Sequence, residues 1–142
     1  DGALYIGTLA LVDSIVRGPS AIVYRVDPAA TDPNDPAKVL SVATPWATGL
    51  WPINGCAFGP DGSFYASQLF TNPSHDPAAI FGDPRGDVVR IPWGHPDTHE
   101  FLTGGALGIT GGVAVGPNGV VYVADRSSFT APGTGRVVRL GH

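Results

Sequence analysis

Short apolar runs, separated by turns rich in glycine, proline and aspartate, dominate the chain. In the clearest example, residues 57–66, two apolar stretches flank a Gly-Pro-Asp-Gly turn at 59–62. This arrangement predicts a β-hairpin. It returns 57 positions later at 114–123, and the chain opens inside a third copy at 1–6. Recurrence at a nearly fixed period predicts a repeat architecture.

A second set of apolar runs repeats in the same phase. Residues 22–26, 87–91 and 136–140 align without gaps, and each carries an arginine near its end. The first two are followed by further runs at 38–42 and 99–102, which we predict to be outer strands. Each repeat therefore predicts several short strands joined by hairpins.

The inner strand of each repeat leads into the turn, at 54–58 and again at 112–115. Counting the repeats from one turn to the next gives modules of approximately 1–58, 59–115 and 116–142 within a single partial domain. Four-stranded units at this spacing are typical of β-propeller blades. The strands show little apolar/polar alternation, as expected for sheets buried on both faces.

We therefore predict an all-β fold: a β-propeller fragment of four-stranded antiparallel blades, about two and a half blades of a six-bladed ring. The first module lacks its inner strand and the last lacks its outer strand. Such a fragment exposes a sheet face and an unpaired edge. We expect a companion polypeptide, copies of this chain or missing N-terminal sequence to complete the ring.

Composition and charge exclude several classes of function. The chain has 142 residues, 43% of them apolar and 14% charged, with a formal net charge of −4. These values describe a folded globular chain without the basic surface that nucleic-acid binding needs. Its apolar runs are too short to span a membrane. The single cysteine, Cys56, excludes an internal disulfide and a cysteine-based zinc site, and we predict that it is a small buried residue.

Connection lengths predict where binding takes place. The inner hairpin turns are minimal, whereas the connections at 9–20, 69–86 and 126–135 are long. In an up-and-down blade these connections lie on the rim opposite the short turns, together with the stretches at 44–53 and 103–111. Long loops on a rigid scaffold commonly carry binding residues, so we expect a ligand on the rim with the long loops.

Three candidate ligand-binding residues follow from strand ends. Asn54 begins an inner strand and could reach a central channel, or it could satisfy local backbone groups. Asp125 ends a strand at the rim with the long loops, where it could bind a ligand or cap the next loop. Trp51, near Trp46, could form an aromatic wall for a ligand or pack between sheets.

Two further candidates, His75 and Asp76, lie in the longest insertion, where we expect ligand contact and no catalysis, because consecutive side chains diverge. His95, Asp97 and His99 have a spacing that can suggest a metal site, but the stretch is better explained as a hairpin turn. No catalytic residue and no cofactor are predicted from the residues themselves.

Residues 112–125 resemble NHL-type propeller repeats. The whole chain resembles the C-terminal half of the ScyD/ScyE family of bacterial propeller proteins, through residues 23–28, 56–62 and 135–140. This resemblance implies a secreted or periplasmic propeller with no catalytic residues to transfer. The expected function is non-enzymatic binding or scaffolding.

An alternative comes from residues 52–62, which are similar to a Pro-Asn-Gly stretch of gluconolactonase-type propellers. That resemblance implies a metal-dependent lactonase, with Asn54 as a ligand to a divalent cation such as calcium in the central channel. Ile53 interrupts the motif, and Thr110 or Gly111 stands where that family has an acidic ligand.

Overall fold

The computed structural model describes residues 1–30, 32 and 34–141. His142, the last residue of the third predicted module, lies outside this description. In chain order the elements are β1 (Leu4–Gly7), α1 (Leu11–Arg17), β2 (Ala21–Val26), a 3-10 turn (Pro28–Ala30), α2 (Pro36–Val42), β3 (Thr44–Leu50), β4 (Ile53–Phe58), β5 (Phe64–Gln68), α3 (Pro77–Gly82), β6 (Asp87–Ile91), β7 (Glu100–Phe101), β8 (Val113–Val115), β9 (Val121–Asp125) and β10 (Arg136–Leu140).

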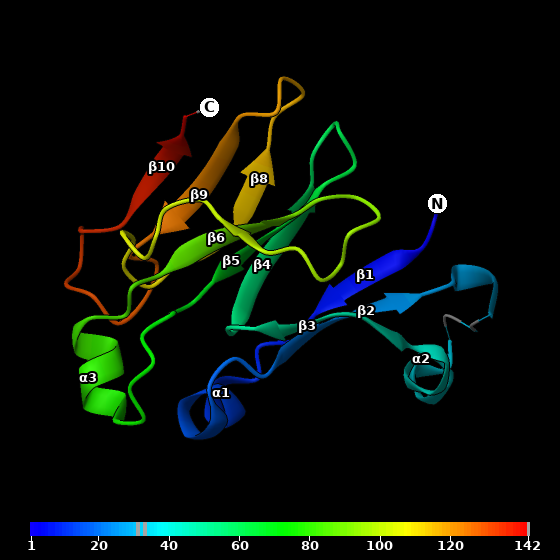
Figure 1. Cartoon of the computed structure of the whole chain (residues 1–142), viewed down its shortest axis with the longest axis horizontal. Coiled ribbons are helices and arrows are strands. Elements are labelled where there is room, and N and C mark those ends of the chain that lie inside the picture. Colours follow the sequence, from blue (N-terminus) through cyan, green and yellow to red (C-terminus); the bar gives the residue numbers. More distant parts are fainter. Residues whose placement is uncertain (31, 33, 142) are drawn as a thin grey trace.

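The strands form three antiparallel sheets that follow one another along the chain (Figure 1). The first sheet has the order β1-β2-β3, the middle sheet β4-β5-β6-β7 and the third sheet β8-β9-β10. The all-β prediction is confirmed. The three sheets contain three, four and three strands, and their arrangement as propeller blades stays a prediction. No sheet of the described residues closes on itself.

The repeated turn forms the predicted hairpins. Strands β4 and β5 are joined through Gly59, whose N–H donates to the carbonyl of Ser63 at 2.9 Å. Gly62 and its repeat equivalent Gly119 have φ angles of 78° and 79°, and Gly2 in the opening copy has 74°. A side chain is strained at such positive φ angles, so the turn requires glycine at this position.

Two predictions around the first outer strand are wrong. Residues 38–42 belong to helix α2, and residues 44–50, expected to be part of a loop, form strand β3 beside β2. The side chain of Asp35 accepts a hydrogen bond from the Ala37 N–H at 3.1 Å, and a proline follows at the start of the helix. This capping arrangement outweighs the strand preference of the β-branched residues after it.

Three buried clusters hold the sheets and helices together. One lies between the first and middle sheets, where the rings of Tyr5, Trp46 and Phe64 meet. A second lies between the middle and third sheets around Tyr65 and Val88. The third contains residues of α1 and α3 together with Leu69 and Phe70, which follow β5. All five residues of β5 are buried, as expected for a strand covered on both faces.

Cys56 differs from its prediction. It is exposed, because it lies on β4, the edge strand of the middle sheet. Neighbouring atoms still desolvate the sulfur enough to raise the pKa of the thiol.

The two ends of the sheets differ. The β4–β5 and β8–β9 turns lie at the upper edge of Figure 1, while α1 and α3 lie at the lower edge. We call these edges the turn rim and the helix rim. Short turns and long connections are therefore on opposite rims, as predicted. None of the described helices is long or apolar enough to cross a bilayer.

Candidate functional site

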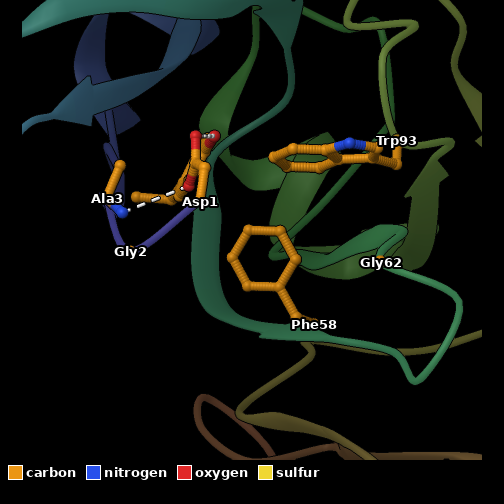
Figure 2. Close-up of a pocket in the computed structure, with 7 residues that line it drawn as sticks. Asp1, Gly2, Ala3, Phe58, Gly62 and Trp93 are labelled. Carbon is orange, nitrogen blue, oxygen red and sulfur yellow. Dashed lines mark hydrogen bonds between the residues drawn. The ribbon is translucent and has the colours of Figure 1, made fainter.

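An open hollow of about 350 Å³ lies on the turn rim between the first and middle sheets (Figure 2). We call it the aromatic hollow. Its lining combines the opening turn of the chain with three aromatic side chains. The lining residues are Asp1, Gly2, Ala3, Tyr5, Phe58, Gly62 and Trp93.

The aromatic rings come from three different strand ends. Tyr5 is on β1, Phe58 closes β4, and Trp93 follows β6. The ring centroids of Tyr5 and Phe58 are 5.0 Å apart and those of Phe58 and Trp93 6.4 Å apart, both in edge-to-face geometry. Phe58 and Trp93 remain exposed to solvent. In Figure 2 their rings lie together, across the hollow from Asp1.

The turn chemistry explains how Trp93 reaches this position. The N–H of His95 donates to the carbonyl of Pro92 at 3.0 Å, and Gly94 has a φ angle of 79°, so 92–95 forms the predicted turn. A side-chain carbon at Gly62 would lie 3.5 Å from Cβ of Trp93. Because 3.5 Å is an ordinary van der Waals distance, the positive φ angle, and not the space beside Trp93, is what requires glycine at position 62.

The polar side of the hollow is formed by Asp1. Its carboxylate makes an ion pair with Arg25 at 2.9 Å and accepts a hydrogen bond from the Tyr5 hydroxyl at 3.1 Å. These contacts fix the opening turn against β2. They also leave the carboxylate already partnered, so a ligand would contact mainly ring faces.

The same ion pair recurs one repeat later. Asp61, equivalent to Asp1, binds Arg90 at 2.8 Å, and Arg90 also binds Glu100 at 2.7 Å. The hydrogen bonds from Arg90, and secondly from Ser63, lower the pKa of Asp61 to about 2. Arg25 and Arg90 therefore have a structural role: each ties its strand to the turn of the same module, whereas the third copy has Asn118 in place of the aspartate.

Replacing Asp61 by asparagine is expected to lower the free energy of unfolding at pH 7 by about 0.5–1 kcal/mol, because the half-exposed pair is screened by solvent. The pKa of Asp61 is lower in the folded protein than its value near 4 in the unfolded chain, so the ionised carboxylate stabilises the fold above about pH 4. This stabilisation disappears as the pH falls to about 2. Urea titrations of both proteins at pH 7 and pH 2 measure the difference.

The stability difference between wild type and Asp61→Asn should therefore be close to zero at pH 2. Asp97→Asn is the matched control, because Asp97 is exposed and the described residues show no hydrogen bond or ion pair to it. An equal difference at both pH values would contradict the role of the Asp61 charge.

A second hollow, of about 530 Å³, occupies the corresponding place between the middle and third sheets. Its lining includes Asp61, Tyr65 and Gly119, the repeat equivalents of Asp1, Tyr5 and Gly62. The position of Phe58 is taken by Val115 in the third module. The cleft is thus a feature of the repeat, whereas the exposed aromatic wall belongs to the first cleft.

The structure places Trp51 and Asn54 in internal contacts. The Trp51 ring packs edge-on against Phe70 at 5.7 Å, and its backbone N–H donates to the side chain of Gln68 at 2.8 Å. The Asn54 Nδ2 donates to the carbonyl of Thr110 at 2.9 Å and so connects two inner segments. No group of three His, Cys, Asp or Glu side chains gathers among the described residues.

The other three candidates also make local contacts. Nδ1 of His75 donates to the carbonyl of Ile15 at 2.7 Å, joining the long insertion to α1. The carboxylate of Asp76 caps α3. Asp125 is buried and pairs with Arg136 at 2.8 Å. None of the five lines the aromatic hollow, and their roles as ligand contacts stay predictions.

No protein-family model, curated protein or solved structure matches this chain. The resemblances to ScyD/ScyE, NHL and gluconolactonase propellers therefore remain predictions, and the site is interpreted from its geometry. The seven residues that line the aromatic hollow include no histidine, cysteine, serine or lysine. Their chemistry is suited to binding an apolar group.

Repeated aromatic positions in the sequence indicate the aromatic hollow, whereas the lengths of the connections do not. Tyr5, Tyr65 and Tyr122 occupy one repeated position, and Phe58 lies directly before a repeated turn. The long connections predicted binding on the helix rim. There Leu11 and Ile15 of α1 and Ile80 and Phe81 of α3 pack into the third cluster, while Val12 and Val16 of α1 stay exposed.

Proposed function

We propose that the chain is part of a non-enzymatic β-propeller that acts by binding or scaffolding, with further modules completing the ring. Three consecutive antiparallel sheets, packed through buried clusters between neighbours, support the propeller. The amino-acid sequence resembles that of the ScyD/ScyE propellers, a family with many exported members, and this resemblance supports a secreted or periplasmic location. The binding role is supported by the aromatic hollow.

The single observation that carries the binding role is the exposure of Phe58 and Trp93 beside Tyr5. Large aromatic side chains gain free energy when they leave water, and exposed clusters of them mark interaction surfaces. Trp and Tyr are also over-represented among the residues that dominate binding energy.

We infer that the ligand is an extended peptide segment that inserts an apolar side chain into the aromatic hollow. The hollow is open to solvent, and aromatic-lined grooves recur in the recognition of extended peptides. The carboxylate of Asp1 at one margin is already bound by Arg25, the Tyr5 hydroxyl and the Ala3 N–H, so the apolar side chain of the peptide supplies the main contact.

Trp93→Ala is expected to weaken peptide binding by about tenfold to a hundredfold, the usual cost of removing an aromatic anchor. The probe is an array of ten-residue peptides with one central Leu, Phe, Tyr or Trp, and the strongest binder is then titrated calorimetrically. Phe101→Ala is the control, because Phe101 is an equally exposed ring on β7, outside the hollow.

The proposal predicts that binding peptides share an apolar central residue, that Trp93→Ala loses them and that Phe101→Ala keeps them. Circular dichroism verifies that both variants are folded. Absence of any binder, or equal binding by Trp93→Ala and wild type, would overturn a peptide-binding role for the hollow.

A further inference from the structure

A cavity of about 330 Å³ lies on the helix rim between the middle and third sheets. Three connections form its walls: residues 81–84 at the end of α3, residues 105–109 before β8, and Arg126 with Thr130 after β9. Arg136, the first residue of β10, completes the lining. We call this space the arginine cavity. It lies on the rim where the connection lengths predict binding.

The connection after β9 is fastened to both of the other walls. The N–H of Ser127 donates to the carbonyl of Ile109 at 2.9 Å. The ring of Phe129 packs against that of Phe81 on α3, with centroids 5.2 Å apart, and Figure 1 shows this connection beside α3. Both contacts hold the wall that carries Arg126 in place.

Backbone strain is concentrated around the same cavity. Among the described residues, four residues other than glycine have positive φ angles. Three of them lie in the connections that form the cavity: Arg85, Arg126 and Phe129, with φ angles of 53°, 55° and 55°. Such conformations are uncommon for residues with side chains, and they occur preferentially at ligand-binding sites.

The stem of the Arg126 side chain lies directly against Gly108. A side-chain carbon at Gly108 would be only 3.0 Å from Cγ of Arg126, closer than ordinary van der Waals contact. The absence of a side chain at this position therefore gives the arginine its path along the cavity wall.

The charges around the cavity leave one positive charge without a counter-ion. In the described part of the chain, the Arg126 guanidinium makes no hydrogen bond or ion pair. Arg136 is neutralised, because its Nε binds the buried carboxylate of Asp125 at 2.8 Å. Asp83 at the margin is likewise paired with Arg85, at 2.9 Å. Two ion pairs and one unpaired arginine give a net charge of +1.

Apart from Thr130 and the charged residues, the lining consists of glycines and apolar residues. Leu107 and Ile109 are buried and form part of the apolar wall together with Phe81 and Pro84. A ligand that matches this lining has one negative charge and a compact apolar body.

We propose that the arginine cavity binds a small molecule with one carboxylate and an apolar body. The planar fork of the Arg126 guanidinium fits the two oxygens of a carboxylate. The terminal nitrogens of Arg136 remain for a further hydrogen bond, because only its Nε is used among the described residues. The cavity volume lies at the lower end of the range for small-molecule sites, about 300–1,000 Å³.

Charge favours a carboxylate over a phosphate group. A phosphate monoester carries about 1.5 to 2 negative charges at neutral pH. The cavity offers one unpaired positive charge, and the carboxylates of Asp83 and Asp125 beside it repel a second negative charge. The arginine cavity and the aromatic hollow share no lining residue, so this site goes beyond the proposed peptide binding.

The experiment is a saturation-transfer NMR titration of the full chain with benzoate, benzamide and phenyl phosphate. The three probes share a phenyl ring and differ in the group that meets the arginines. Benzoate is expected to bind saturably. Benzamide and phenyl phosphate should bind about tenfold more weakly or less, because the first lacks the charge and the second carries too much of it.

Arg126→Gln removes the positive charge, so its dissociation constant for benzoate should rise about tenfold or more. Arg126→Lys keeps the charge without the planar fork and should bind with intermediate affinity. Arg139→Gln is the matched control with the same change of charge. Arg139 is exposed on β10 outside the cavity, so this variant should bind benzoate like wild type. Circular dichroism verifies that each variant is folded.

Trp93→Ala separates this proposal from the peptide site and should leave benzoate binding unchanged. Loss of benzoate binding in Trp93→Ala would place the probe in the aromatic hollow and overturn the proposal. Absence of saturable benzoate binding up to about 20 mM, or equal binding by Arg126→Gln and wild type, would also overturn it. Equal binding of benzamide would exclude recognition of the charge, and equal or tighter binding of phenyl phosphate would exclude the carboxylate class.

Discussion

Phe64→Ala is expected to lower the free energy of unfolding by about 3–5 kcal/mol, the range for removing a buried phenylalanine ring. Phe64 is fully buried between the first and middle sheets. Its ring contacts those of Trp46 and Phe58 at centroid distances of 5.6 Å and 5.3 Å. The substitution therefore removes apolar burial and leaves a cavity at the junction of two sheets.

The measurement is denaturant unfolding followed by circular dichroism, with Phe101→Ala as the matched control. Phe101 is exposed on β7, so the same change there should cost less than about 0.5 kcal/mol. Phe64→Leu, which refills most of the volume, should lose clearly less than Phe64→Ala. Equal costs at positions 64 and 101 would mean that the first sheet does not pack on the middle sheet as described.

Local turn chemistry made the hairpins predictable from sequence. A Gly-Pro-Asx-Gly turn between apolar runs leaves few alternatives, because only glycine adopts the positive φ angle at Gly62 and Gly119 without strain. The repeat then placed the equivalent strands. The first outer strand was mispredicted because a short capped helix and a strand containing Pro45 follow each other there. Proline is tolerated in β3 because it is an edge strand.

The candidate site was harder to predict, because polar residues in connections serve the backbone first. Asp76 caps a helix and Asn54 binds a carbonyl 56 positions away, a partner that only the folded chain identifies. The aromatic hollow brings Asp1 and Trp93 together from distant parts of the chain. The exposed aromatic side chains occur only in the cleft between the first and middle sheets. The repeat therefore predicts that a cleft forms between neighbouring sheets, but not which side chains line it.

A buried carboxylate organises the connection that leads into the third sheet. Asp87, the first residue of β6, is almost completely buried. Its Oδ1 accepts hydrogen bonds from the Thr103 N–H and hydroxyl, both at 2.9 Å, and its Oδ2 accepts one from the Gly105 N–H at 2.8 Å. It also accepts one from the Val88 N–H at 2.7 Å. Among the described residues, four hydrogen bonds and no ion pair satisfy the Asp87 carboxylate.

Asp87→Ala is expected to lower the free energy of unfolding by about 3 kcal/mol or more, because it leaves several buried donors without an acceptor. Asp97→Ala is the matched control and should change stability by less than about 0.5 kcal/mol, since Asp97 is exposed. Chemical denaturation measures both variants.

The loss should also be local. Hydrogen exchange of the Thr103 and Gly105 amides is expected to accelerate in Asp87→Ala by about tenfold or more beyond the change in global stability, because these amides lose their acceptor. Asp87→Asn retains one acceptor oxygen but turns an N–H₂ group toward the other donors, so it should also be destabilised. If Asp87→Asn is as stable as wild type, the charge is not what holds the 103–105 connection in place.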